Sequence, residues 1–394
     1  IKCIPMNRSE NDIFERINWE NGMDIDANDL IMTENFFLNS MYKMKQTSLP
    51  AFGYGLLPDK NLDTQDQGTD MEVYHTVTDK VEIRVNRCLG VTRSGFIVDY
   101  KAGVEDNMSL KITIPAETIR REITGKANRW NILLTVSPYE RVLSGTPDNA
   151  TLPPRFPYVK PSYTLSLSPI ERTIISANVL ILGRLRMEGE RFLLDYTYIP
   201  PCTSLTAHAE LIRYYRYFGQ MFNSIEKSSK DIVAKVINRS DSSPIAINTA
   251  CICKSILHYT AMCFFEYRNL GMFWHPAKMI DCYSSLAHIC FNSLNFLEKT
   301  EKEDLMQYFY EWSDISPVAF ESLMNEAIDI EYEHTDLQSA FFIIEKFLKA
   351  LSELWQMLVS LDYIGRHKDN IVIGERKYSD NRGKSTEWTP FDRM

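Results

Sequence analysis

The stretch Leu193-Leu194-Asp195-Tyr196-Thr197-Tyr198-Ile199-Pro200-Pro201-Cys202 divides this chain into two parts of different character. The part that ends at Pro201 holds 13 of the 17 prolines and 11 of the 16 glycines, scattered among short β-type runs. Long stretches with helical spacing follow it. Two adjacent prolines remove two backbone N–H donors and keep the preceding residue extended, so neither a helix nor a strand can run through them. We therefore predict a rigid interdomain hinge at Ile199, Pro200 and Pro201.

The part before the prolines has the alternating pattern of antiparallel strands. Apolar residues recur with period two from Met71 to Val77 and again from Val81 to Val85. Further strand candidates cover residues 95–100, 110–114, 132–136, 163–167, 179–187 and 192–199, with glycine and proline between them. A short helix is expected at 36–44, and a stiff loop with five prolines at 145–161. This spacing predicts an antiparallel β-sandwich.

The part after the prolines has the pattern of antiparallel helices. Two seams repeat with heptad spacing: Leu211, Tyr215, Phe218, Phe222, Ile225, Ser229, Ile232 and Val236 in the first, and Leu337, Phe341, Ile344, Leu348, Leu351, Trp355 and Leu358 in the second. Only Ser229 interrupts the apolar pattern. Both seams need helical partners, which lie either within a bundle or in another copy of the chain. The spacing does not separate the two, because knobs-into-holes packing is the same in both.

Further helices are expected at 245–269, 276–294, 303–312 and 317–331. At 394 residues the chain is long enough for two or three domains. We predict an α+β, multidomain chain with an N-terminal β-sandwich at 1–202, a central helical bundle at 203–312 and a mainly helical C-terminal domain with a short tail at 313–394.

Composition and charge exclude several classes of protein. The net charge of −9 argues against a dedicated nucleic-acid binder, which normally carries a basic patch. The most apolar stretch, residues 252–267, contains Lys254, His258 and Glu266, so it is too short and too polar to span a bilayer. The eight cysteines include no CxxC pair, and residues 1–10 lack an apolar signal core. These features predict buried, free thiols in a cytoplasmic protein.

Two segments begin like ligand-binding motifs and then depart from them. The run from Asp24 to Asp29 starts like a calcium loop, but Asp29 stands where the turn needs glycine, and Asn35 stands where a bidentate glutamate is needed. A solvated acidic loop is the favoured interpretation. Gly53-Tyr54-Gly55-Leu56-Leu57-Pro58 starts like a dinucleotide fingerprint, but Pro58 replaces the third glycine and no βαβ unit surrounds it. A structural bend is expected there.

Two further clusters contain residue types that are common in metal sites and catalytic sites. Cys251, Cys253, His258, Cys263, Cys282, His288 and Cys290 lack the close spacing of structural zinc ligands, so core packing is favoured. The run Gly365-Arg366-His367-Lys368-Asp369-Asn370 resembles a lipid-kinase catalytic loop without its first aspartate. No glycine-rich phosphate loop and no Asp-Phe-Gly accompany it. A helix C-cap at Gly365 and a short strand at 371–373 are expected instead. We predict no catalytic residue, no metal and no cofactor.

Two segments taken together resemble a known family. Ile17-Asn18-Trp19-Glu20-Asn21-Gly22-Met23 is followed by Phe36-Phe37 and Gly53-Tyr54-Gly55-Leu56, and the Ile199-Pro200-Pro201-Cys202 turn leads into a long helix. This combination is similar to the TssK family of type VI secretion system baseplate proteins, which has Trp-x-x-Gly-Met and Tyr-Gly-Leu segments and an Ile/Phe-Pro-Pro-Cys turn. The similarity is clearest over residues 17–57 and 155–235.

The resemblance implies a structural adaptor without enzymatic activity. Members of the family form homotrimers with a β-sandwich shoulder, a helical bundle and a C-terminal head. The shoulder is expected to bind baseplate wedge proteins of the TssF and TssG type, and the C-terminal domain to bind membrane-associated components, at the inner face of the inner membrane. The residues expected to bind the wedge are Trp19, Gly22, Met23, Phe36 and Tyr54. For Trp19 and Met23 a clasp onto the chain's own sandwich is the alternative, and Gly22 is expected to need a positive φ.

The chain also departs from the family's pattern. The His-Phe pair that follows Gly-Met in better-known members has only Asp29-Leu30 or Asn35-Phe36 as equivalents, and residues 313–394 lack a longer mixed head. A divergent system, such as those of Bacteroidetes, would account for this. Two other functions stay open: a phage-derived receptor-binding or adhesin-like structural protein, and an enzyme with a degraded kinase-like loop.

Overall fold

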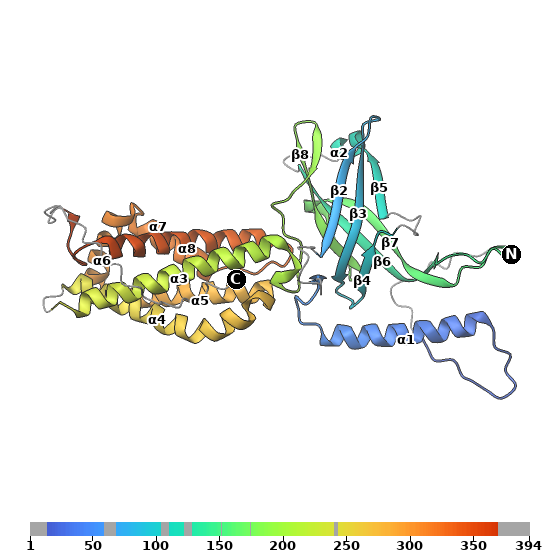
Figure 1. Ribbon diagram of the computed structural model, residues 1–394, viewed down its shortest axis with the longest axis horizontal. Helices are drawn as coiled ribbons and strands as arrows, with labels where there is room; N and C mark the ends of the chain where they lie inside the picture. Colours follow the sequence, from blue (N-terminus) through green and yellow to red (C-terminus); the bar gives the residue numbers. More distant parts are fainter. Residues whose placement is uncertain are drawn as a thin grey trace, which may run out of the picture. The chain divides into compact units, whose positions relative to one another are not determined.

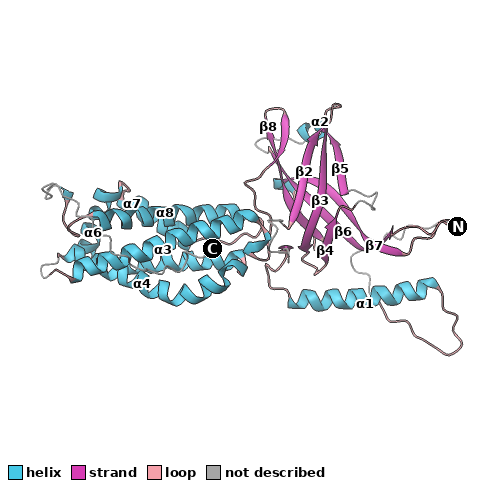
Figure 2. Ribbon diagram, viewed as in Figure 1, coloured by secondary structure: helices cyan, strands magenta, loops and turns pink. Residues whose placement is uncertain are grey.

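The computed structural model describes residues 14–58, 68–103, 110–121, 128–150, 152–173, 175–239 and 243–368. Of these, residues 14–57 and 68–196 form one compact unit, and residues 197–239 and 243–368 belong to a second. The first unit contains the strands and two helices, and the second contains the remaining helices (Figures 1 and 2). The α+β multidomain class is therefore confirmed.

The first unit is built from two antiparallel sheets. In one sheet β3 (Lys80–Val91) pairs with β1 (Gly55–Leu56), β2 (Thr69–His75), β4 (Ile97–Lys101) and β5 (Leu110–Pro115). In the other sheet the order is β7 (Tyr158–Pro169), β6 (Arg129–Ser144), β8 (Val179–Glu188) and β9 (Arg191–Leu194). Each strand predicted between residues 71 and 199 overlaps one of these strands.

Both sheets contribute to one apolar core, which makes the unit a β-sandwich. Val81 and Ile83 alternate inward along β3, as the period-two pattern requires. From the other sheet, Trp130 packs edge-on against Phe192 with ring centroids 5.5 Å apart. The short helix α2 (Ala116–Arg121) adds Ile119 to this core.

The N-terminal helix α1 (Ala27–Ser48) belongs to the first unit and is longer than the predicted 36–44. It begins earlier because Asp26 accepts from the backbone N–H groups of Asn28 and Asp29, and the Asp29 side chain accepts from the Asp26 N–H, forming a capping box. One face contacts the sheets, with Tyr42 packed 3.5 Å from the Phe96 ring centroid. None of the 22 residues of α1 is buried.

The second unit is a helical bundle. Its helices are α3 (Ala209–Ile237), α4 (Pro244–Leu270), α5 (Pro276–Asn295), α6 (Lys299–Ser313), α7 (Pro317–Ile328) and α8 (Leu337–Ser360). Proline occupies the start of α4, α5 and α7, where its missing N–H costs nothing. The helices α3 and α8 pack along each other (Figure 1).

Three predicted boundaries and one predicted cap differ from the structure. The proline-rich loop is shorter than 145–161, because β7 already begins at Tyr158. The strand expected at 192–199 ends at Leu194, and the helix expected at 317–331 ends at Ile328. The helix C-cap expected at Gly365 is wrong: α8 ends at Ser360 with Leu361 as its C-cap, and Gly365 lies in the turn that follows, with φ of +85°. The strand expected at 371–373 lies outside the described residues.

Candidate interaction surfaces

The N-terminal arm, residues 14–26, presents large apolar side chains to solvent. Trp19 is 49% exposed and Met23 is 40% exposed, so neither is clasped into the sandwich core of its own chain. Between them Gly22 adopts φ of +85°, a conformation that glycine reaches without steric cost, in the turn where the Met23 N–H donates to the Glu20 carbonyl. The turn therefore displays Trp19 and Met23 on the outside of the unit.

The arm packs against β6 and α1 through two other residues. Phe14 packs 4.3 Å from the Tyr139 ring of β6, and the Arg16 guanidinium lies 5.3 Å from the centroid of the Phe36 ring. Phe36 is half-buried beneath this cation–π contact. Phe36 thus links the arm to α1 while part of its ring remains accessible.

Tyr54 lies in a different environment from the other predicted binding residues. It is only 6% exposed, and its hydroxyl accepts a hydrogen bond of 2.6 Å from Arg93, whose guanidinium also lies 4.5 Å from the ring centroid. In this position Tyr54 supports the start of β1 from inside the unit, and its side chain is not displayed to a partner.

An apolar surface that was not predicted lies on α1. Leu30, Phe37, Met41 and Met44, here called the α1 stripe, are 60–73% exposed. Their spacing of seven, four and three residues places them on one helical face. Asn39, which accepts a hydrogen bond from Tyr139, and Tyr42 lie on another face, which contacts the sheets. The heptad spacing was visible in the sequence, but exposure could not be deduced from it.

The predicted hinge residues lie just inside the helical unit. The division between the units falls after Tyr196, and Ile199, Pro200 and Pro201 are buried beyond it. The Tyr198 hydroxyl donates to the Thr335 carbonyl at 3.2 Å. After the prolines, the Leu205 N–H donates to the Trp274 carbonyl at 2.8 Å. The segment that carries the prolines is therefore fastened to the bundle at both of its ends.

The two seams pack against each other within one chain. Phe218 of α3 lies 6.0 Å from Phe341 of α8, ring centroid to ring centroid. Phe222, Leu348 and Trp355 are buried as well. Ser229, the polar break in the first seam, accepts a hydrogen bond of 2.9 Å from the indole N–H of Trp355. The serine that interrupts the first seam thus supplies the hydrogen-bond acceptor for the buried indole N–H of the second seam.

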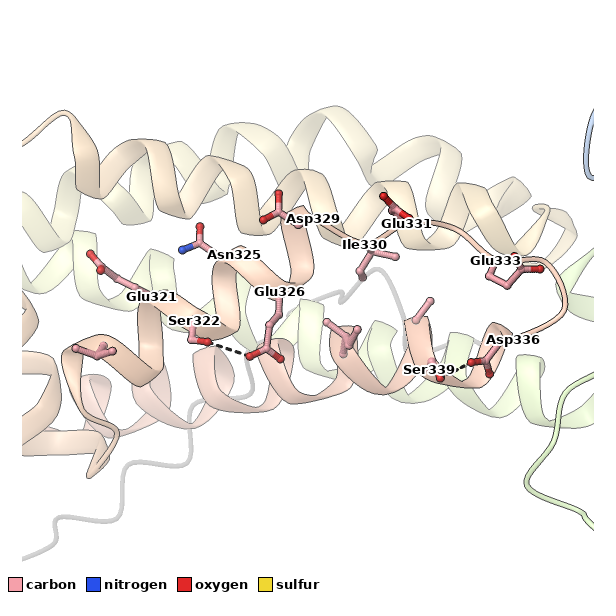
Figure 3. Close-up of a pocket in the computed structure, with 13 residues that line it drawn as sticks. Glu321, Ser322, Asn325, Glu326, Asp329, Ile330, Glu331, Glu333, Asp336 and Ser339 are labelled. Carbon is pink, nitrogen blue, oxygen red and sulfur yellow. Dashed lines mark hydrogen bonds between the residues drawn. The ribbon is translucent and has the colours of Figure 1, made fainter. Parts of the chain in front are cut away.

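A groove of about 680 Å³ lies between α7 and α8 and is strongly acidic (Figure 3). Six carboxylates line it: Glu321, Glu326, Asp329, Glu331, Glu333 and Asp336. Several of them have partners within the chain, such as Lys302, 2.7 Å from Glu321, and Ser322, which donates to Glu326. A surface of this charge repels nucleic acid and favours a basic partner.

The segments that resemble ligand-binding motifs have structural roles in the part of the chain that the structure describes. Asp26, in the calcium-like run, caps α1, and the two backbone N–H donors lower its pKa. In the kinase-like run, His367 pairs with Glu311 at 2.7 Å, while Asp369 and Asn370 lie outside the described residues. Burial raises the pKa of Cys253 and Cys290 to about 12. Within the described ranges, no group of His, Cys, Asp and Glu could hold a metal ion, and no helix is long and apolar enough to cross a membrane.

Comparison with known proteins gives similarity in structure only. No protein-family model matches the sequence, and no curated protein sequence is detectably similar to it. A crystal structure of TssK matches with 13% identity and a TM-score of 0.49 over 93% of this chain and 73% of that chain. TssK from the type VI secretion system of EAEC, bound to a nanobody, matches with 12% identity and a TM-score of 0.48, covering 82% of this chain and 98% of that one.

A third match is a TssK-TssF-TssG baseplate subcomplex solved by cryo-electron microscopy, with 12% identity and a TM-score of 0.46, covering 86% of this chain and 99% of that chain.

Proposed function

We propose that this protein is a structural, non-catalytic adaptor of a type VI secretion baseplate. Its β-sandwich unit attaches to wedge proteins of the TssF and TssG type, and residues 313–394 attach to membrane-associated components. The protein acts in the cytoplasm, at the inner face of the inner membrane, as a homotrimer. The joint occurrence of the Trp19–Met23 segment, the Tyr54 segment and the Ile199–Cys202 turn, in the order typical of TssK, supports this assignment.

The α1 stripe and the arm carry the proposal physically. A docking surface requires exposed apolar side chains. They are present on a 22-residue helix with no buried residue, which displays Leu30, Phe37, Met41 and Met44, and on the preceding arm, which displays Trp19 and Met23. Aromatic residues and methionine are enriched at the centres of protein interfaces, and contiguous apolar patches are rare on isolated soluble proteins. We infer that the wedge proteins cover this surface.

The adaptor role also needs the bundle to transmit force between its ends. Because the two seams are already buried against each other, trimer formation would use surfaces other than Phe218, Phe222, Phe341, Leu348 and Trp355. A contact made at the acidic groove needs lysine or arginine from the partner.

The test is co-purification of the full chain with the TssF- and TssG-like proteins encoded near its gene. The double substitution Phe37→Asp and Met41→Asp should reduce capture at least about tenfold, because truncation or charging of an interface centre costs ~2 kcal/mol or more. Val77→Asp is the matched control: this residue is an exposed apolar side chain in the turn after β2 of the same unit. It should leave capture unchanged.

The outcomes separate the possible functions. Failure of the wild-type chain to bind wedge proteins would contradict the adaptor role and favour a receptor-binding protein used elsewhere. Binding that survives the α1 double substitution would keep the adaptor role but refute the α1 stripe as its surface. Light scattering of the purified chain should give three times the monomer mass, and a monomer across micromolar concentrations would refute the homotrimer.

A further inference from the structure

Two cysteines on neighbouring helices of the bundle face each other. Cys263 stands seven residues before Leu270, the end of α4, and Cys282 stands six residues after Pro276, the start of α5. Because a short turn joins these antiparallel helices, that count brings the two residues level along the helix axes. Their side chains are close enough to affect each other's ionisation. A contact one turn earlier in α4 supports this alignment of the two helices: the Tyr259 hydroxyl donates to the Cys282 carbonyl at 2.5 Å.

Cys263 is set apart from the other thiols by its position. It is half-buried at the bundle surface, whereas Cys88, Cys202, Cys253 and Cys290 are buried. Cys251 is exposed, but it has no second cysteine within reach on its face of α4, because Cys253 points into the core. Among the described residues, Cys263 combines access to solvent with a thiol neighbour.

The surroundings of Cys263 favour its thiolate. The Cys282 thiol donates to the Cys263 sulfur, and the Lys278 ammonium adds a favourable charge, which together lower the pKa of Cys263 to about 7. Glu266 opposes this effect. Tyr259 has a single hydroxyl proton and uses it on the Cys282 carbonyl, so the Cys282 thiol is the main donor. The same contact raises the pKa of Cys282 well above its usual value.

We propose that Cys263 and Cys282 are a redox-sensitive thiol pair, which a low-molecular-weight disulfide such as oxidised glutathione converts to a disulfide between α4 and α5. Cys263 is the attacking residue and Cys282 the resolving residue. This site is independent of the proposed baseplate role, since it concerns the bundle alone.

The reaction balances without any further reactant. The Cys263 thiolate attacks one sulfur of the small disulfide, forms a mixed disulfide and expels one small thiolate. Cys282 then loses its proton to solvent and attacks the Cys263 sulfur, which expels the second small thiolate. The protein loses two electrons and two protons, and the small disulfide gains them as two thiols. A thiol whose pKa lies near ambient pH is the best nucleophile for this exchange.

The experiment uses the folded full-length chain and an aromatic disulfide, DTNB, whose released thiolate is coloured. Cys3 and Cys251 are first replaced by serine, because the latter is exposed and would react directly. This parent should release two equivalents of thiolate in a fast phase and retain no adduct. Cys282→Ser should release one equivalent and retain the adduct on Cys263. Cys263→Ser should slow the reaction at least about tenfold, to the rate of buried thiols.

Peptide mapping identifies the bond that forms. Trypsin cleaves after Lys254, Arg268, Lys278 and Lys299, so the disulfide should join peptide 255–268 to peptide 279–299, with fragmentation placing it on Cys282 and not on Cys290. The variant Cys290→Ser should still release two equivalents of thiolate from DTNB in the fast phase. A fast phase that survives Cys263→Ser, a stable adduct in the parent, or the absence of any fast phase would overturn the proposal.

Discussion

Two histidines act as helix N-caps in the bundle. His208 precedes α3 and His275 precedes α5, and each Nδ1 accepts from the backbone N–H two residues later, at 3.2 and 3.1 Å. A ring nitrogen can accept only while the imidazole is neutral. Burial lowers the pKa of His208 to about 4, which keeps this cap in its accepting form at neutral pH.

The His208 cap predicts a specific loss of stability in acid. The folded-state pKa is about 4 and the unfolded value is 6.5, so the unfolded chain binds the proton more readily between them. The neutral His208 cap therefore contributes to the free energy of unfolding in full above pH 6.5. This contribution, up to about 3 kcal/mol, is lost as the pH falls toward 4. Asparagine also caps helices, so His208→Asn should be less sensitive than wild type between pH 7.5 and 5 in urea unfolding. An unchanged pH dependence in this variant would contradict the assignment.

A tyrosine network ties α3, α4 and α5 together and allows a graded prediction. Tyr267 donates to the Tyr215 carbonyl at 2.9 Å and accepts from the Tyr283 hydroxyl at 2.8 Å. Tyr267→Phe leaves the buried Tyr283 hydroxyl without this acceptor, so it should cost about 2–3 kcal/mol of unfolding free energy. Tyr283→Phe removes only one donor and should cost about 1 kcal/mol. Equal losses for the two variants in urea unfolding would show that the Tyr267 acceptor is not what holds Tyr283.

At the scale of the elements, the pairing of α3 with α8 rests on one buried polar contact as well as on apolar packing. Ser229→Ala removes the acceptor of the Trp355 indole N–H and should cost about 1–3 kcal/mol, because the N–H stays buried without a partner. In the Trp355→Phe background the same serine substitution should cost much less, which a double-mutant cycle measures directly. Additive losses would mean that Ser229 and Trp355 are not coupled.

The same pair shows what the sequence could and could not predict. Heptad spacing located both seams, and the break at Ser229 was visible, since periodicity directly reflects which helical face is apolar. That Ser229 meets Trp355 was not predictable, because knobs-into-holes packing within a chain and between chains follows one rule. The partner of a seam is a property of the tertiary structure.

In the β-sandwich unit, local patterns predicted strands well and exposure poorly. Alternation located β3 because Val81 and Ile83 face the core. By contrast, Trp19 and Tyr54 were both predicted to bind the wedge proteins, yet the first is exposed and the second is buried beside Arg93. The residues next to Trp19 and Tyr54 in the sequence do not indicate which of the two side chains is exposed. The same limit hid the α1 stripe, whose apolar residues alternate with polar ones as in any amphipathic helix.

For the whole molecule, the cores decide which parts can fold alone. The sandwich core draws on β2, β3 and β5 to β9 with α2, none of which extends beyond Leu194. The bundle core joins helices on both sides of residue 312, because α8 covers α3 with Phe341, Leu348 and Trp355. A helix pair that loses its covering helix exposes a continuous apolar face.

This arrangement predicts how fragments of the chain behave. A fragment of residues 197–394 should give a helical circular dichroism spectrum and a single cooperative thermal transition, because it holds all the helices that form the bundle core. A fragment of residues 197–312 should lack the cooperative transition, since Tyr214 and Phe218 would face water where Phe341 of α8 now packs against them. Cooperative unfolding of the shorter fragment would instead establish residues 313–394 as a separate domain. The proposed contact to membrane-associated components would then reside on a module that could be exchanged without disturbing α3.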